Sequence, residues 1–332
     1  MERAQGPNKL RLLFGGDVML GRRVNEMIYR EGAAYPLGAL ASLTRAADLF
    51  LVNLECAISP RDLRYSGPEK AFYFRADPVA AETLRIAGVD LVSLANNHAL
   101  DADYDGLRDT LDILDDYKIV CVGAGENLEA ARRPAFLEAK GQRLGVIACC
   151  DHQSDFAACT NQPGIRYVAR KNPAMVSQIT RDVEALARRV DHVIVAVHWQ
   201  ANWVPEVAPL YRSMARLWVE AGARVVWGHS PHHFQGVEWI GESAVLYATG
   251  DLVDDYRLKP DFRNDRQLLF QVILSDQGVE QILAYPLELS QGRTSTAASE
   301  ARQWIARRFE QMCSDLGSRV VHDDGWLRVL PG

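Results

Sequence analysis

Five short polar clusters in this sequence each follow directly on a run of apolar residues. The clusters are Gly16-Asp17, Asn53-Leu54-Glu55, Asn96-Asn97-His98, His198-Trp199 and Gly228-His229-Ser230-Pro231-His232. Apolar runs that are rich in Val, Ile and Leu and end at turn residues are typical of strands buried on both faces. In an open α/β sheet the ends of such strands meet at one crevice, where ligands bind. Because carboxylates, amides and imidazoles gathered there would bind divalent metals, the clusters predict a metal-dependent hydrolase.

The first two clusters supply carboxylates. Asp17 follows Gly15-Gly16, which would let the backbone turn tightly and leave the carboxylate projecting from the strand end. An N-cap role for Asp17 in the next helix is an equal alternative. Asn53 and Glu55 lie two residues apart, so both point to the same side of an extended chain. Since a carboxylate at the end of a buried strand needs a cation or a partner, this pair favours metal binding.

The cluster Asn96-Asn97-His98 is the most specific of the five. An asparagine carbonyl is a neutral oxygen ligand, and the adjacent imidazole can protonate a leaving group without binding the metal. Asp101, three residues further on, would hold the His98 ring in one tautomer and raise its basicity. The competing interpretation is a turn that leaves His98 on the surface, which the preceding strand disfavours.

Three further histidines follow two other strands. His198 ends the apolar run 193–197, where a lone histidine is more often a hydrogen-bonded core residue than a ligand. Because the other polar clusters also follow strand ends, we expect His198 to be a metal ligand instead. His229 and His232 flank Ser230-Pro231, and the proline fixes the loop so that both rings can face one point. We place His152 at the edge of the same crevice, in a structural or substrate-contact role.

The composition is that of an ordinary globular protein with an acidic balance. The chain has 332 residues, with 37 Lys and Arg against 43 Asp and Glu and a net charge of −6. This balance argues against a nucleic-acid surface, which needs a concentrated basic patch. The N-terminus is polar, no apolar run is long enough to span a bilayer, and the six cysteines lack CxxC spacing. We therefore expect a cytoplasmic protein with reduced thiols.

Strand-like and helix-like segments alternate as far as His232, which indicates parallel strands with helical crossovers. Four strand-like segments then follow without long helices between them, and a helix over 294–312 comes last. This order predicts an α/β fold with two sheets in a sandwich and helices outside; a single mixed sheet is the alternative. We divide the chain into a disordered N-terminus (1–8), one domain (9–290) and a C-terminal helical extension packed on that domain (291–332).

Together these residues resemble the bacterial capsule synthesis protein CapA (poly-γ-glutamate biosynthesis) family, a branch of the calcineurin-like metallophosphoesterase superfamily. The resemblance runs over about residues 10–255. The matching stretches, in the family's order, are Gly-Asp-Val-Met-Leu-Gly-Arg (16–22), Asn-Leu-Glu (53–55), Phe-Arg (74–75), Asn-Asn-His-Ala-Leu-Asp (96–101), His-Trp (198–199) and Gly-His-Ser-Pro-His-His-Phe-Gln (228–235). As a set they are highly specific.

The resemblance implies a four-layer α/β/β/α sandwich of the metallo-dependent phosphatase type, with mixed sheets and a metal site at the strand ends. The metal ligands that it implies are Asp17, Glu55, Asn97, His198, His229 and His232. His98 would be the general acid, with Asp101 behind it. The residues that we expect to contact substrate are Arg22, Asn53, Arg75, His152, Trp199 and Asp251. The two guanidinium groups suit an anionic substrate.

Several positions depart from the superfamily or family pattern, among them Gln200 and Asn202, which stand where the family has glycine and glutamate. Met19 stands where a histidine usually follows the first aspartate, and the Asn53/Glu55 pair replaces the usual bridging aspartate. Asp251 stands where the family has asparagine, which adds a carboxylate near the site. These departures leave two alternatives for the metal site: one ion, or two ions about 4 Å apart. The sequence also lacks the N-terminal membrane anchor that is usual in capsule members.

We predict hydrolysis of a phosphoester or a γ-glutamyl (polyglutamate) amide in an anionic small-molecule or peptide substrate. Water on the metal would become a hydroxide that attacks the substrate, while His98 protonates the leaving group. Mixed oxygen and imidazole ligands suit Mn, Fe or Zn. The alternative is a non-catalytic accessory protein of poly-γ-glutamate synthesis that binds the polymer or a ligase partner. We expect no nucleic acid and no membrane anchor, and we allow for a homodimer.

Overall fold

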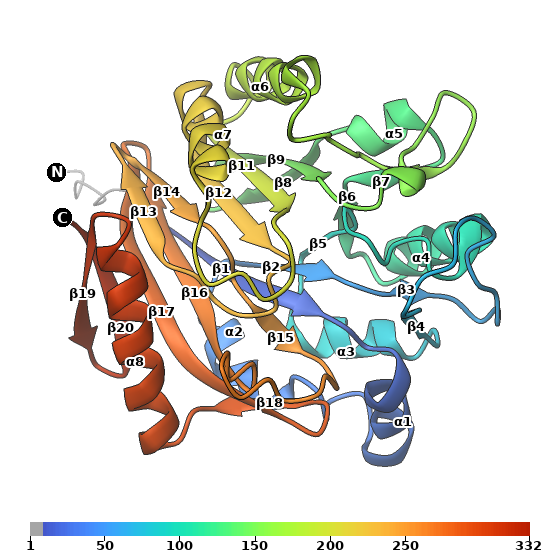
Figure 1. Cartoon of the computed structure of the whole chain (residues 1–332), viewed down its shortest axis with the longest axis horizontal. Coiled ribbons are helices and arrows are strands. Elements are labelled where there is room, and N and C mark those ends of the chain that lie inside the picture. The colour runs from blue at the N-terminus through green and yellow to red at the C-terminus, as the bar shows by residue number, and fades with distance from the viewer. Residues whose placement is uncertain (1–8) are drawn as a thin grey trace, which may run out of the picture.

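Two β-sheets lie face to face in the middle of the molecule, and helices cover their outer faces (Figure 1). This computed structural model describes residues 9–332. The expectation of disorder for residues 1–8 therefore lies outside the described residues. Helices α6 and α7 lie over the smaller sheet, whereas α2 and α3 lie on the opposite side of the molecule.

The larger sheet has ten strands, in the order β19-β20-β17-β16-β1-β2-β5-β6, with β15 paired to β1 and β18 paired to β17. Their bounds are β1 (Leu10–Val18), β2 (Leu49–Leu54), β5 (Leu91–Ser93), β6 (Val120–Val122), β15 (Asp251–Val253), β16 (Arg266–Ser275), β17 (Gly278–Ser290), β18 (Arg293–Thr296), β19 (Ser318–Asp323) and β20 (Trp326–Pro331). The strands β1, β2, β5 and β6 run parallel, whereas β16, β17 and β20 are antiparallel to their neighbours. The sheet is therefore mixed, as predicted.

The smaller sheet has six strands, in the order β13-β14-β12-β11-β9-β8. Their bounds are β8 (Ala135–Ala139), β9 (Gln142–Cys150), β11 (His192–His198), β12 (Ala223–His229), β13 (Val237–Ile240) and β14 (Ser243–Leu246). Two short pairs complete the strands: β3 (Ala57–Ile58) with β4 (Arg75–Ala76), and β7 (Ala124–Gly125) with β10 (Gly164–Ile165). The central strands β9, β11 and β12 run parallel, so their carboxyl ends meet at one edge.

The connecting helices follow the apolar patterns of the sequence. Their bounds are α1 (Arg22–Glu31), α2 (Ala41–Thr44), α3 (Ala80–Ala87), α4 (Asp103–Asp116), α5 (Leu128–Arg132), α6 (Pro173–Ala187), α7 (Pro209–Glu220) and α8 (Ser299–Ser314), with 3₁₀ turns at Gly38–Leu40 and Ser154–Phe156. Helix α6 begins after Asn172, whose side chain accepts from the N–H groups of Ala174 and Met175. None of the helices in residues 9–332 is both long and apolar enough to cross a membrane.

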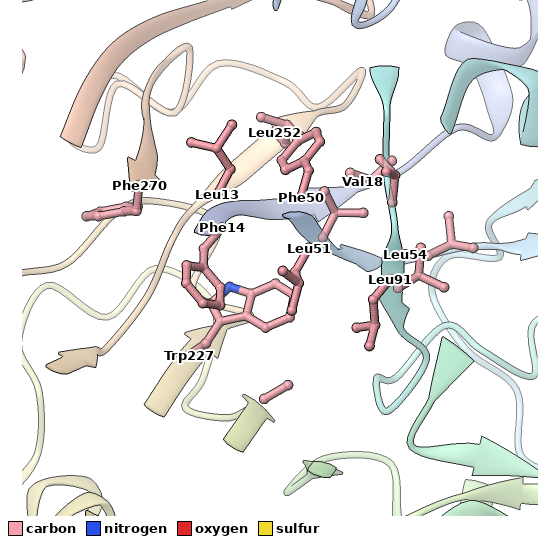
Figure 2. Packing of buried hydrophobic residues seen from close by; sticks show 14 of the residues in the cluster. Leu13, Phe14, Val18, Phe50, Leu51, Leu54, Leu91, Trp227, Leu252 and Phe270 are labelled. Atoms are coloured by element: carbon pink, nitrogen blue, oxygen red, sulfur yellow. The ribbon is translucent and has the colours of Figure 1, made fainter. Parts of the chain in front are cut away.

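Alternating side chains divide the interior into layers. In β11, Ile194 and Ala196 belong to the core shared with the larger sheet, whereas Val193, Val195 and Val197 pack under α6 and α7. Phe14 of β1 meets Trp227 of β12 with ring centroids 5.5 Å apart, and this contact joins the two sheets (Figure 2). The predicted four-layer α/β/β/α sandwich is confirmed, and the single-sheet alternative is wrong.

Strand β1 differs from its prediction because it does not turn at Gly15-Gly16. It continues to Val18, and the Asp17 N–H donates to the Gly250 carbonyl at 2.8 Å. A Cβ on Gly16 would lie 1.9 Å from that carbonyl oxygen, so only glycine permits this approach. The close packing aligns Asp17 with Asp251 of β15. The glycines therefore allow two strands to touch rather than the chain to turn.

The C-terminal segment 291–332 is not purely helical, which corrects the prediction. It contains strand β18 and the hairpin β19–β20 as well as α8, and β20 pairs with β17 of the larger sheet. These strands were missed because their outer faces are only half buried and their apolar alternation is weak. The segment does pack on the main domain: Phe309 of α8 lies 5.9 Å from Phe270 and 6.1 Å from Phe234, centroid to centroid.

Replacing Phe309 by alanine tests whether the C-terminal segment shares the core of the domain. Phe309 is fully buried, so Phe309→Ala should lower the free energy of unfolding by about 3–5 kcal/mol in a single urea transition. The control Arg307→Ala, on the exposed face of α8, should change it by less than about 0.5 kcal/mol. A separate early transition for the C-terminal segment would contradict this packing.

Candidate metal centre

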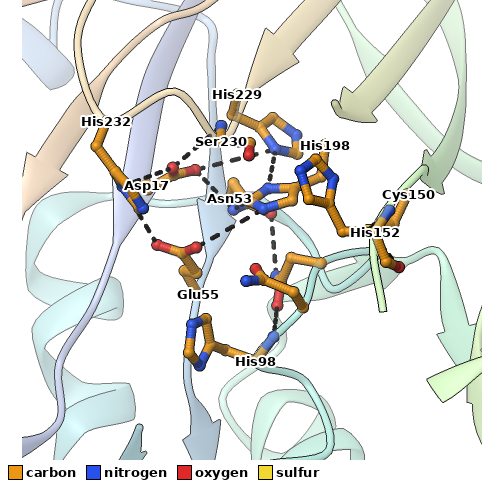
Figure 3. A network of polar contacts seen from close by, with 12 residues as sticks. Asp17, Asn53, Glu55, His98, Cys150, His152, His198, His229, Ser230 and His232 are labelled. Atoms are coloured by element: carbon orange, nitrogen blue, oxygen red, sulfur yellow. Dashed lines mark hydrogen bonds and ion pairs between the residues drawn. The ribbon is translucent and has the colours of Figure 1, made fainter. Parts of the chain in front are cut away.

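The polar clusters of the sequence converge where strands from both sheets end (Figure 3). Asp17 lies at the end of β1 and Glu55 directly after β2. His198 and His229 are the last residues of β11 and β12, and these two positions pair across the sheet. Because neighbouring parallel strands end at the same edge, residues far apart in the sequence come together here.

Two overlapping groups of side chains have the geometry to hold a metal ion. One group is Asp17, His198 and His229, and the other is Asp17, Glu55, His232 and Asp251. In each group, one donor atom per residue lies within 4.8 Å of all the others, and every residue is buried. Asp17 belongs to both groups. Its carboxylate therefore joins the two groups.

Hydrogen bonds orient the shared carboxylate. Asp17 Oδ1 accepts from the Asn53 amide at 2.7 Å, and Oδ2 accepts from the Ser230 backbone N–H at 3.2 Å. His232 Nδ1 lies 3.6 Å from Asp17 Oδ2 and 2.9 Å from Asp251 Oδ1. His198 Nε2 lies 3.7 Å from Glu55 Oε1. The ligand groups are thus held by the fold itself.

Several donor atoms at this place are buried without a hydrogen-bond partner. They are Glu55 Oε1, His229 Nε2 and Asp251 Oδ2, all in residues of the two ligand groups. Asn97 Oδ1 is buried without a partner as well, and its role as a ligand stays a prediction. A buried polar atom without a partner costs free energy, so it is rare in a folded protein. The three atoms in the ligand groups, carboxylate oxygen or imidazole nitrogen, suit a divalent transition metal. The residues present therefore fit the ion that the family resemblance implies.

The electrostatics of the site also fit a cation. Burial raises the pKa of Asp17 to about 7 and that of Asp251 to about 8, and it raises the pKa of Glu55 well above its usual range. Burial lowers the pKa of His229 to about 3 and that of His198 well below its usual value. The imidazoles are therefore neutral, which is their metal-binding form, whereas the carboxylates need a nearby positive charge to ionise.

The loops that carry the histidines have an unusual backbone. Four non-glycine residues there have positive φ: 70° at Gln200, 61° at Trp203, 110° at Ser230 and 60° at His232. The Ser230 hydroxyl donates to the Gln200 carbonyl at 3.2 Å, which ties the two loops together. Such conformations cost about 1–3 kcal/mol each and cluster at functional sites. Here they aim His232 at Asp17.

A second polar unit, built around His98, lies beside the ligand groups. The Nδ1 atom of His98 contacts the Asp101 carboxylate, and the His98 ring stacks on Phe74 with centroids 3.9 Å apart. Asp101 also accepts from the Phe74 backbone N–H at 2.7 Å and pairs with Lys70. Burial lowers the pKa of His98 to about 4. The expected contact between His98 and Asp101 is present.

Three of the residues expected to contact substrate do something else. Trp199 is fully buried against Trp218 and Tyr247, and its indole N–H donates to the Tyr247 carbonyl at 2.8 Å. Its place in the core under α7 is a correction to the prediction. Asn53 is also fully buried and holds Asp17, and Asp251 lies in a ligand group. Neither placement tests a substrate contact, so that role stays a prediction for both.

The two arginines expected to bind an anionic substrate already have carboxylate partners. Arg22 Nε donates to Asp255 at 3.1 Å, and Arg75 donates to Asp77 at 2.6 Å. Neither guanidinium carries a free charge toward the site, so their expected role is not supported. His152 does lie at the edge, with its ring 5.6 Å from that of His198. Its substrate contact stays a prediction.

Sequence reasoning missed three residues that shape the site. Lys70 is almost buried and binds both Asp101 and the Asn97 carbonyl. Tyr256 donates its hydroxyl to Glu55 Oε2 at 3.3 Å, and the Asn96 amide donates to Asn53 Oδ1 at 3.1 Å. Asn96 belongs to the cluster Asn96-Asn97-His98, in which the resemblance implies Asn97 as the ligand. Lys70 and Tyr256 lie in loops without periodic pattern, so no signal pointed to them.

Comparison with known proteins now identifies the family. The family model described as "Bacterial capsule synthesis protein PGA_cap" matches residues 11–256. This chain belongs to that family. The PGA_cap match spans β1 to β15 and contains every residue of both ligand groups, which confirms the family expected from the motifs.

Two curated relatives and one solved structure extend this finding. A probable polyglutamine synthesis accessory protein of Mycobacterium tuberculosis (strain CDC 1551 / Oshkosh) is 30% identical, over 99% of this chain and 98% of its own length. The capsule biosynthesis protein CapA of Bacillus anthracis is 26% identical, over 88% of this chain and 70% of its own. A hypothetical protein from Thermus thermophilus shares the fold with a TM-score of 0.51 and 17% identity, over 84% of this chain and 99% of its own.

Asp17→Asn should remove most metal binding because Asp17 serves both ligand groups. For the parent protein, free Mn²⁺, Fe²⁺ or Zn²⁺ at 100 times Kd should stabilise the fold by about 2.7 kcal/mol, seen as a rise in Tm. Asp17→Asn should abolish that rise, whereas Asp112→Asn on the exposed face of α4 should keep it. A full metal-dependent rise in Asp17→Asn would contradict the shared-ligand geometry.

Proposed function

We propose that this protein is a metal-dependent hydrolase whose substrate is a phosphoester or a γ-glutamyl-type amide with negative charge. The observation that carries the proposal is the sharing of Asp17 by two ligand groups beside the buried His98–Asp101 pair. Metal-site hydrolases need such a ligand set together with a proton donor close to it.

We propose two ions, Mn, Fe or Zn, because of the charge balance at the site. The ligands contribute three carboxylates, from Asp17, Glu55 and Asp251. One divalent ion would leave a net negative site, which repels an anionic substrate, whereas two would leave it positive. The nearby cations Arg22, Arg75 and Lys70 cannot supply this charge, because each is paired with its own carboxylate. Bound there, the ions would activate a water and stabilise negative charge that develops on the substrate.

His98 and its neighbours would supply the proton that the leaving group needs. In the free protein the His98 ring is neutral, with Nδ1 facing Asp101 and Nε2 able to accept a proton. Negative charge on a bound substrate would raise the His98 pKa, so that Nε2–H could donate to the leaving group. Asp101 would keep the ring in the required tautomer, and Lys70 would keep Asp101 in place. The stacking on Phe74 would fix the ring plane.

A non-catalytic accessory role is the second candidate. The observation in its favour is the printed name of the mycobacterial relative, an accessory protein that matches this chain along almost its whole length. In this role the site would bind a polymer or a ligase partner, and the metal would serve structure alone.

A hydrolysis screen separates the two candidates. The protein, loaded separately with Mn²⁺, Fe²⁺ and Zn²⁺, is offered phosphoesters and γ-glutamyl peptides, and Asp17→Asn treated in the same way is the control. Turnover of either class by the parent protein alone supports the hydrolase. A protein that binds metal but turns over neither class with any ion would contradict it and favour the accessory role.

His98→Asn should lower turnover by about 10²- to 10⁴-fold while the metal content stays that of the parent protein. The reason is that His98 contacts Asp101 and Phe74 but belongs to neither ligand group. Turnover and metal content are measured on the same preparation, with the exposed His322→Gln as control. Loss of metal together with activity would show that His98 is a ligand instead.

Lys70→Met should lower kcat about tenfold or more with little change in KM, because Asp101 loses the ammonium group that holds it. Lys70→Arg, which keeps the charge, should restore part of the loss. An equal fall for Lys70→Met and Lys70→Arg, with a lowered Tm in both, would mean that Lys70 only packs the loop.

A further inference from the structure

A cavity of about 560 Å³ lies apart from the metal centre, between α5, β9 and α6. Its floor contains the buried side chains of Ile147 and Leu186, and Leu128 adds a partly exposed apolar wall. Arg132, Arg133, Asp182 and Arg189 line it as well. No lining residue belongs to either ligand group. A concave space of this size with an apolar floor is typical of small-molecule sites.

The lining carries more positive than negative charge. Asp182 is already fully engaged: it accepts from Arg132 at 3.2 Å and from Gln178 at 2.9 Å, and it pairs with the buried Arg166 behind the cavity wall. One carboxylate therefore serves two guanidinium groups. The positive charge of Arg166, whose side chain is only 4% exposed, is incompletely balanced in a region of low dielectric.

Two lining arginines have no carboxylate partner at all among residues 9–332. Arg133 forms no ion pair there, and Arg189 lies with its guanidinium 5.3 Å from the centroid of the Phe136 ring. Glu129 is the remaining lining carboxylate, and in the described structure it pairs with neither of them. An exposed arginine alone would mean little, but here two of them line one cavity together with Arg132.

We propose that this cavity binds a small organic anion, with a carboxylate or phosphate group held by Arg133 and Arg189 and its carbon skeleton on Ile147 and Leu186. Guanidinium groups form paired hydrogen bonds with both kinds of oxyanion, which makes arginine suited to this task. The ligand would bind in addition to the substrate of the metal centre, since the two places share no residue.

The test is a calorimetric titration of metal-free protein, so that no anion can bind through a metal ion. The probes are inorganic phosphate and glutarate, which separate the two oxyanion chemistries. The parent protein should bind one equivalent of at least one probe, and Arg133→Gln/Arg189→Gln should weaken this binding at least tenfold. Both arginines are exposed, so the double variant should keep the parent Tm.

The matched control removes the same charge elsewhere. Arg188→Gln/Arg307→Gln changes two exposed arginines, one next to Arg189 and one on α8, and neither lines the cavity. It should bind the probe as the parent protein does. Absence of saturable binding with both probes, or an equal loss in the control variant, would overturn the proposal.

Discussion

The structure depends on the burial of three carboxylates side by side. Asp17, Glu55 and Asp251 are each at most 1% exposed, and without a cation their charges oppose one another. Burying an ionised group without compensation is among the costliest acts in a protein. Burial therefore raises the pKa of all three carboxyl groups, and a bound metal ion would stabilise their ionised form. The neutral imidazoles among them complete the ligand set.

The surrounding architecture holds these buried groups in a geometry that suits binding. Gly16 allows β1 to touch the chain at Gly250, which brings Asp17 level with Asp251. The positive φ values of Ser230 and His232 aim a histidine from the other sheet at the same point. The positive φ values cost free energy, and this cost would be offset when the site is filled.

The sequence predicted the layers and the strand ends well because apolar runs report burial directly. The strands that end at His198 and His229 are apolar runs of this sort, and their parallel arrangement brings the two histidines together.

The prediction from sequence failed where the role of a residue depends on the direction of its side chain or on its partner in an ion pair. A residue at a strand end faces either layer, which is why Trp199 points into the core and Asn53 supports Asp17. Arg22 pairs with Asp255, which only the folded chain brings near, and Arg75 pairs with Asp77, two residues further along the chain. Lys70 comes from a loop of irregular structure whose position no local pattern encodes.

The most direct test of the shared-carboxylate account is crystallography of the metal-loaded protein with anomalous diffraction at the absorption edge of the bound ion. The account predicts two anomalous peaks, both within coordination distance of the Asp17 carboxylate, one beside His198 and His229 and the other beside Glu55, His232 and Asp251. Saturated crystals with no peak at this place, or with a single ion that Asp17 does not touch, would contradict it.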